Sequence, residues 1–168
     1  MLAVGPATGQ FLWFLAVCTQ RTRILDLGTG VGYSALWLAD AARRTGGYVI
    51  SVDHDESKLA TAITHAANAD CLDRVRFEHA DALAFLGRDA GPWDLVLLDL
   101  WKEAYVPCFE ALLPVLAPDA LVVADNMRYP AETRPMATRY QEIARTAPGM
   151  LSFEVDIGNG LELSWVDR

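Results

Sequence analysis

The sequence has few basic side chains. Its 168 residues include 14 lysines and arginines against 22 aspartates and glutamates, which gives a formal net charge of −8. An acidic protein repels phosphate backbones and anionic lipid surfaces, so a nucleic-acid partner is disfavoured. We therefore expect a small-molecule substrate and no membrane partner.

Cysteines and long apolar runs are also scarce. The three cysteines, Cys18, Cys71 and Cys108, are odd in number and widely spaced, which fits neither a disulfide framework nor a zinc site. The apolar stretch 11–18 is shorter than the ~20 residues that a membrane helix needs, and no basic leader precedes it. We interpret this stretch as a buried or amphipathic helix, and we expect a cytoplasmic protein.

Apolar runs of strand length alternate with helical patterns along the chain, whose length is typical of a single domain. The last two apolar runs flank Gly158-Asn159-Gly160, which is typical of a hairpin turn. This order predicts an α/β fold with a Rossmann-like, doubly wound, seven-stranded sheet, mostly parallel with a C-terminal antiparallel hairpin. The expected strands are 23–27, 48–53, 75–78, 94–98, 120–124, 151–156 and 161–166, and the expected helices are 32–44, 56–71, 82–86, 103–116 and 135–146.

Nearly every strand end on the ligand-binding side of such a sheet carries an acid. Ligands bind at the carboxyl ends of the strands, near the switch in strand order. The residues concerned are Asp26 with the glycines at 28, 30 and 32, then Asp53, Asp81, Asp99 and Asp125-Asn126.

The glycine run predicts a cofactor loop, although a plain tight turn is the alternative. Its G-x-G-x-G spacing differs from the G-x-G-x-x-G fingerprint of dinucleotide sites. In this setting Asp53 is placed to accept the hydroxyls of a ribose, and Asp26 to accept an amino group. Asp81 or Ala82 is placed to face an adenine. Many acids without a basic side chain suit a sulfonium and an amine better than a pyrophosphate.

Segments 24–39, 49–53 and 94–99 resemble the successive motifs of class I S-adenosylmethionine methyltransferases. The resemblance implies that Gly28, Tyr33 and Ser34 hold the methionine end of the cofactor. It also implies that Asp53 binds the ribose and that Asp81 and Ala82 meet the adenine. Two of these assignments have alternatives, because Tyr33 and Ser34 fit an ordinary helix start. The remaining cofactor contacts expected on this basis are Val4, His54 and Asp99.

Asp99, Asp125 and Asn126 form a hard-oxygen set suited to Mg²⁺ or Ca²⁺ if their strands are neighbours. A helix cap at Asp99 and a turn at Asp125-Asn126 are the alternative. Lys102 is one of only two lysines, the other being Lys58, in a chain whose remaining cations are arginines. Because arginine is the default surface cation here, the position of Lys102 just after a strand end favours a chemical role for this side chain.

Segments 98–105, 124–130 and 160–162 are similar to cation-dependent catechol and caffeoyl-CoA O-methyltransferases. The resemblance implies that Asp99, Asp125 and Asn126 bind a divalent cation (Mg²⁺, or Ca²⁺ or Mn²⁺). It further implies that Lys102 is the general base and that Asn126 also contacts substrate. Glu162 would bind the substrate's second hydroxyl, and Trp101 and Pro130 would clamp the ring. The alternatives are a solvated Lys102, a core Trp101 and an exposed acid at 162.

Members of this family usually carry further N-terminal helices that partly cover the active site. We expect residues 1–168 to form one methyltransferase domain without that lid, and a homodimer is compatible with its absence. Arg128 lies in a loop that differs from the family, and we hypothesise that it recognises an acidic group on the substrate.

The leading functional hypothesis is metal-dependent O-methylation of a small phenol with two neighbouring hydroxyls. One alternative is O-methylation of hydroxyuridine in tRNA, which needs a local patch from the arginines at 128, 134, 139 and 145. Another is an NAD-dependent oxidoreductase, and a third is a cofactor-binding module without catalysis.

Overall fold

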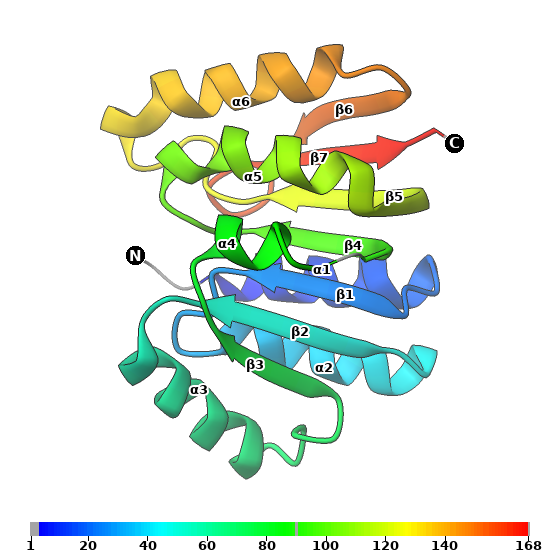
Figure 1. Ribbon diagram of the computed structural model, residues 1–168, viewed down its shortest axis with the longest axis vertical. Coiled ribbons are helices and arrows are strands. Elements are labelled where there is room, and N and C mark those ends of the chain that lie inside the picture. Colours follow the sequence, from blue (N-terminus) through cyan, green and yellow to red (C-terminus); the bar gives the residue numbers. More distant parts are fainter. Residues whose placement is uncertain (1–3, 90, 168) are drawn as a thin grey trace.

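The computed structural model describes residues 4–89 and 91–167, which fold around one seven-stranded sheet. The strand order is β3-β2-β1-β4-β5-β7-β6, and β7 alone runs in the direction opposite to the other strands (Figure 1). The predicted doubly wound sheet with a C-terminal antiparallel hairpin is therefore confirmed. The strands are β1 (Arg23–Leu27), β2 (Tyr48–Asp53), β3 (Val75–His79), β4 (Trp93–Leu98), β5 (Leu116–Ala124), β6 (Met150–Val155) and β7 (Leu161–Val166).

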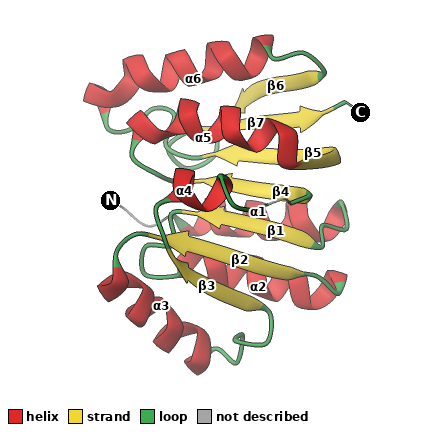
Figure 2. Cartoon of the chain, viewed as in Figure 1, coloured by secondary structure: helices red, strands yellow, loops and turns green. Residues whose placement is uncertain are grey.

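Helices cover both faces of the sheet, as Figure 2 shows. One apolar core lies between the sheet and the last three α-helices, and it contains Phe85, Phe109 and Tyr140. A second core lies on the opposite face, where Leu12 and Leu38 come from the first two helices. The helices are α1 (Pro6–Cys18), α2 (Tyr33–Thr45), α3 (Glu56–Asn68), α4 (Ala82–Leu86), α5 (Tyr105–Leu112) and α6 (Arg134–Thr146), with single 3₁₀ turns at Lys102–Ala104, Leu113–Val115 and Ala131–Thr133.

The strand register brings the predicted site residues to one edge of the sheet. Leu27, at the end of β1, pairs with Val52 of β2 on one side and with Leu98 of β4 on the other. Leu98 in turn pairs with Ala124 of β5. The residues that follow these strand ends therefore lie next to each other, although they are up to a hundred positions apart in the sequence.

The segment 103–116 differs from the prediction of one continuous helix. The structure divides it into a 3₁₀ turn, α5, a second 3₁₀ turn and the start of β5. Proline explains the division, because it lacks a backbone N–H and its ring clashes with a helix carbonyl four residues earlier. Pro107 is tolerated because it lies in the first turn of α5, and Pro114 ends the regular helix.

No helix in the described ranges is long and apolar enough to cross a membrane.

Candidate active site

The glycine loop after β1 packs directly against the end of β4. Gly28 has a φ of 106°, which is a left-handed conformation that favours glycine. A Cβ atom at this position would lie only 1.9 Å from the carbonyl oxygen of Asp99. The close approach of the loop to β4 therefore requires glycine here, and it places the loop beside the predicted metal ligands.

Asp26 lies fully buried beneath this loop. The hydroxyls of Ser34 and Ser51 donate to its Oδ2 at 3.0 and 2.7 Å. Its Oδ1 is buried and has no hydrogen-bond partner among the described residues. Burial raises the pKa of this carboxyl to about 6, because desolvation disfavours the charged form. One carboxylate oxygen is thus left without a donor directly below the glycine loop.

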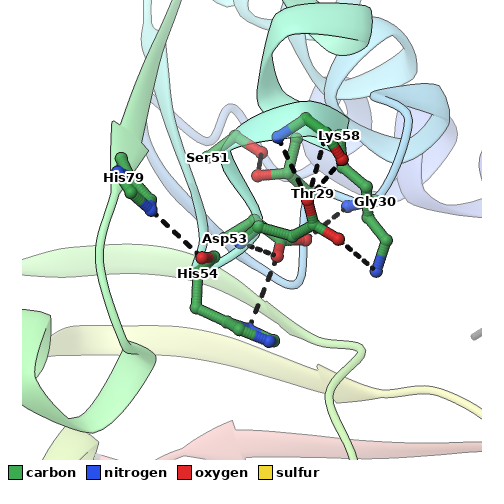
Figure 3. Close-up of polar contacts among 9 residues, drawn as sticks. Thr29, Gly30, Ser51, Asp53, His54, Lys58 and His79 are labelled. Atoms are coloured by element: carbon green, nitrogen blue, oxygen red, sulfur yellow. Dashed lines mark hydrogen bonds and ion pairs between the residues drawn. The ribbon is translucent and has the colours of Figure 1, made fainter.

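Asp53, at the end of β2, is held by backbone donors (Figure 3). The N–H of Gly30 donates to Oδ2 at 2.8 Å, and the N–H of Asp55 donates to Oδ1 at 3.0 Å. The His54 ring nitrogen Nδ1 lies 3.6 Å from Oδ1, and His79 Nε2 lies 3.0 Å from the His54 carbonyl oxygen. Each carboxylate oxygen keeps a further lone pair, so Asp53 can still accept from a ligand.

A cleft of about 290 Å³ opens beside these residues. None of the described residues that line it is a lysine or an arginine. Asp81 both borders the cleft and caps α4, because its Oδ1 accepts from Ala84 N at 2.9 Å. The lining residues are Gly28, Val52, Asp53, His54, Ala80, Asp81, Ala82, Leu83, Leu100, Trp101, Ala104, Pro107 and Cys108.

Five of the predicted cofactor residues do not line this cleft. Asp26 lies beneath the glycine loop and Asp99 lines the second cleft described below, and the other three lie elsewhere. Tyr33 is half-buried against Trp37, with ring centroids 6.4 Å apart, and it borders a separate surface groove. Val4 is buried in the core beneath α1 and α2. Ser34 acts through Asp26, as described above. Direct contacts of these three with a cofactor remain predictions.

Asp99, Asp125 and Asn126 come together at the tips of β4 and β5. Both carboxylates are buried, with exposed fractions of 4% and 2%. The Asn126 amide lies between them, where Nδ2 donates to Asp99 Oδ1 at 3.1 Å and to Asp125 Oδ2 at 3.2 Å. The same three groups were predicted to converge. This set consists of two carboxylates and one amide. Within 4–89 and 91–167, no cluster of three or more His, Cys, Asp or Glu side chains is suited to a metal.

Burial disfavours the charged form of both carboxylates. Burial, followed by the charges of Asp125 and Asp26, raises the pKa of Asp99 to about 7. Burial also raises the pKa of Asp125. Throughout the described part of the chain, no lysine, arginine or histidine forms an ion pair with either carboxylate.

Lys102 is buried beside this pair and is not solvated. Its Nζ donates to the carbonyl oxygen of Asp125 at 3.0 Å and lies 3.8 Å from the centroid of the Tyr105 ring. The Tyr105 hydroxyl donates to the same carbonyl at 2.9 Å. Burial lowers the pKa of Lys102 to about 8, which increases the fraction of neutral amine at physiological pH. Tyr105 was not identified from the sequence, although it follows Lys102 by one helical turn.

A second cleft, of about 280 Å³, adjoins the first and shares Leu100 and Trp101 with it. Trp101 is 58% exposed, so it is not a core residue. Tyr129 is exposed as well and adds an aromatic wall that sequence reasoning missed, although it precedes Pro130 directly. The lining residues are Asp99, Leu100, Trp101, Lys102, Asn126, Tyr129, Pro130 and Thr133.

The structure does not bring Glu162 into this cleft. Its side chain is fully buried on β7, and it accepts two hydrogen bonds from Arg145, both at 2.7 Å. Gln141 and Ser152 donate to it as well, at 2.9 and 2.8 Å. Four donors thus occupy both oxygens. The geometry therefore gives no support to the predicted contact between Glu162 and a substrate hydroxyl.

Arg128 is also engaged within the protein. Its guanidinium forms ion pairs with Glu154 and Asp156 on the β6–β7 hairpin. The hypothesis that Arg128 recognises an acidic substrate group is not supported, because its donors already meet these carboxylates. Arg139 pairs with Glu142 and Arg145 with Glu162, so three of the four arginines considered for an RNA-binding patch form ion pairs within the protein.

The sequence of this chain is similar to those of known methyltransferases. A family model described as a methyltransferase domain matches residues 25–127. A catechol O-methyltransferase of Niastella koreensis is 33% identical over 130 residues, which cover 75% of this chain and 58% of that protein. A probable O-methyltransferase of Mycobacterium tuberculosis is 36% identical over 161 residues, covering 89% and 66%. The chain thus spans between 58% and 66% of the length of these two relatives.

The fold agrees with a solved relative. The O-methyltransferase TomG from Streptomyces achromogenes, solved in complex with S-adenosylmethionine, has a TM-score of 0.89 and 26% identity, covering 99% of this chain and 82% of that one. The matched family model covers Asp26, Asp53, the glycine loop and the Asp99–Asp125–Asn126 set. This chain belongs to the methyltransferase domain family.

Proposed function

We propose that this chain is an S-adenosylmethionine-dependent O-methyltransferase that acts on a catechol-like phenol with the help of a divalent cation. One observation carries the proposal: two clefts meet at Trp101, the first beside the glycine loop and the second beside Lys102 and the two buried aspartates. Methyl transfer needs a methyl donor and an oxygen nucleophile in line, and adjoining clefts can align them.

The first cleft suits S-adenosylmethionine. The unpartnered Oδ1 of Asp26 is an acceptor for an amino group, and Asp53 retains lone pairs for ribose hydroxyls. Its lining lacks the lysine or arginine that would favour the pyrophosphate of NAD. His54, Asp81 and Ala82 line the part of the cleft that would receive the adenosine.

The acidic set at the second cleft suits a hard cation. Two buried carboxylates that lack an ion-pair partner are costly unless a positive charge binds between them. Asp99, Asp125 and Asn126 would hold Mg²⁺, or Ca²⁺ or Mn²⁺, through oxygen atoms. A divalent cation bound there would stabilise the ionised form of a phenol hydroxyl.

The residues of the second cleft would orient the substrate and take its proton. Trp101, Tyr129 and Pro130 offer flat surfaces for an aromatic ring. Lys102 Nζ, held by the Asp125 carbonyl, would accept the proton of the hydroxyl that becomes methylated. Its lowered pKa keeps part of the amine neutral and therefore able to accept a proton.

A methyl-transfer assay tests the proposal. S-adenosylmethionine would be incubated with catechol, caffeic acid and a phenol with a single hydroxyl, with Mg²⁺ or with a chelator. We expect methylation of the two vicinal diols that requires the cation and is lost in Asp125→Ala, but not in the matched surface variant Glu110→Ala. Full turnover in chelator would refute the cation, and methylation of no phenol would refute the substrate class.

A further inference from the structure

The Asn126 amide is held by a second amide from the β6–β7 turn. Asn159 Nδ2 donates to Asn126 Oδ1 at 2.9 Å. This contact leaves Asn126 Nδ2 facing the carboxylates of Asp99 and Asp125. The Asn126 amide is therefore bonded at both ends, by the two acids on one side and by Asn159 on the other.

The backbone keeps both amides in place. The N–H of Met127 donates to the Gly160 carbonyl at 3.0 Å, and the N–H of Arg128 donates to the Asn159 carbonyl at 2.9 Å. The ion pairs of the Arg128 side chain with the β6–β7 hairpin add a further connection. Because these bonds fix the two backbone segments together, the asparagine side chains can turn without separating.

The Asn126 amide turns its Nδ2 toward the two carboxylates, and this orientation suits the acids when no cation lies between them. An amide NH₂ satisfies the acids, but a hard cation needs the amide oxygen instead. An amide can both donate and accept, so a pair of amides can reverse the direction of its hydrogen bond. After a half-turn of both groups, Asn126 would present Oδ1 to the cation and donate from Nδ2 to Asn159 Oδ1.

We propose that Asn159 is a positioning residue for the cation site and that its amide turns together with that of Asn126 when the cation binds. This inference rests on the cation site of the proposed function. It adds Asn159, from the β6–β7 turn, to a site whose other residues follow β4 and β5. It also gives a role to the amide of Asn159, which can either donate or accept a hydrogen bond.

The variant Asn159→Asp tests the inference, because a carboxylate only accepts hydrogen bonds. In this variant only the cation-binding orientation of Asn126 keeps a bond to position 159. We expect Mn²⁺ to bind the variant about tenfold more tightly than the wild type. The affinity is measured by electron paramagnetic resonance of free Mn²⁺, without cofactor or substrate, so the readout does not depend on activity.

Two controls separate the hydrogen bond from the added charge. Long-range attraction by the new carboxylate is screened by salt, so the titration is repeated at ~0.1 and ~0.5 M KCl. Asn159→Leu removes the bond from both orientations, and it should leave the Mn²⁺ affinity within about threefold of the wild type because the two losses offset each other. Thermal unfolding without cation verifies that each variant is folded.

The outcomes separate the two proposals. A gain in Asn159→Asp that persists at high salt, with Asn159→Leu close to the wild type, supports the inference. A gain that disappears at high salt, no gain, or an equal gain in Asn159→Leu overturns it. A wild-type protein that binds no Mn²⁺ overturns the cation site itself, and with it the role of Asn159.

Discussion

Three neighbouring strands, β4, β5 and β7, carry buried acids whose surroundings differ. On β7, Glu162 accepts four hydrogen bonds, two of them from the guanidinium of Arg145. At the tips of β4 and β5, the carboxylates of Asp99 and Asp125 share the amide of Asn126 and have no ion-pair partner among the described residues. The buried cation nearby, Lys102, donates to a carbonyl oxygen instead.

The difference separates a structural charge from a binding site. A buried charge with a full set of donors is satisfied by the fold. Glu162 is such a charge, and its bonds to Arg145 and Gln141 link β7 to α6. Buried charges without a counterion destabilise the folded state until a ligand neutralises them. Asp26, with one unpartnered oxygen, belongs to the second class. The contrast predicts opposite effects when acids of the two classes are neutralised.

The largest effect is expected at Lys102. Lys102→Met removes the proposed proton acceptor and should lower kcat for catechol methylation by about a thousandfold. Lys58→Met is the matched control, because it changes the only other lysine in the chain. Single-turnover rates with saturating cofactor give the measurement. An unchanged kcat in Lys102→Met would mean that this buried amine has a structural role, like that of Arg145.

Asp99→Asn should separate stability from activity. It removes one of two buried like charges, so the free energy of unfolding without cation should rise at pH 8. The same change should weaken Mg²⁺-dependent activity by about a hundredfold, because an oxygen ligand loses its charge. Urea unfolding and the Mg²⁺ dependence of kcat/KM provide the two measurements. A variant that is less stable and fully active would reverse the assignment.

Glu162→Gln should show the opposite pattern. It leaves Arg145 without its carboxylate and should cost about 2 kcal/mol of stability, less than a fully buried pair because the Arg145 side chain is 44% exposed. The Mg²⁺ dependence of activity should stay that of the wild type. Glu142→Gln changes an exposed acid on α6, the helix that carries Arg145, and is the control for urea unfolding. A selective loss of catechol binding would restore the predicted substrate role of Glu162.

The last prediction is a pH dependence of stability that comes from Asp26. Burial raises its pKa in the folded protein to about 6, from 3.8 for an exposed aspartate. The unfolded chain therefore ionises first, and the stability from this group is full below pH ~4 and is lost as the pH rises to ~6. Asp26→Asn should make the decline shallower in urea unfolding at stepped pH, while the raised pKa values of Asp99 and Asp125 account for the remainder. If stability falls with pH at the same slope in the variant and the wild type, the decline comes from another group.

The sequence predicted the site at β4 and β5 because each acid directly follows an apolar strand. In a parallel sheet that position alone brings Asp99 and Asp125 together at one edge. The environment of Glu162 was beyond such reasoning. The alternation in β7 indicates a face of the sheet, but three of the four hydrogen bonds on that face come from α6, whose packing is a tertiary property. For Asn159 the sequence indicates only a turn, because its contact with Asn126 depends on how β5 and β7 pair.

The most direct measurement is a calorimetric titration of Mg²⁺ into protein saturated with S-adenosylhomocysteine, using the wild type, Asp99→Asn and Glu162→Gln. We predict one binding site in the wild type and in Glu162→Gln, and its loss in Asp99→Asn. Absence of binding in the wild type, or equal binding in all three proteins, would contradict the assignment of the β4–β5 acids to a cation.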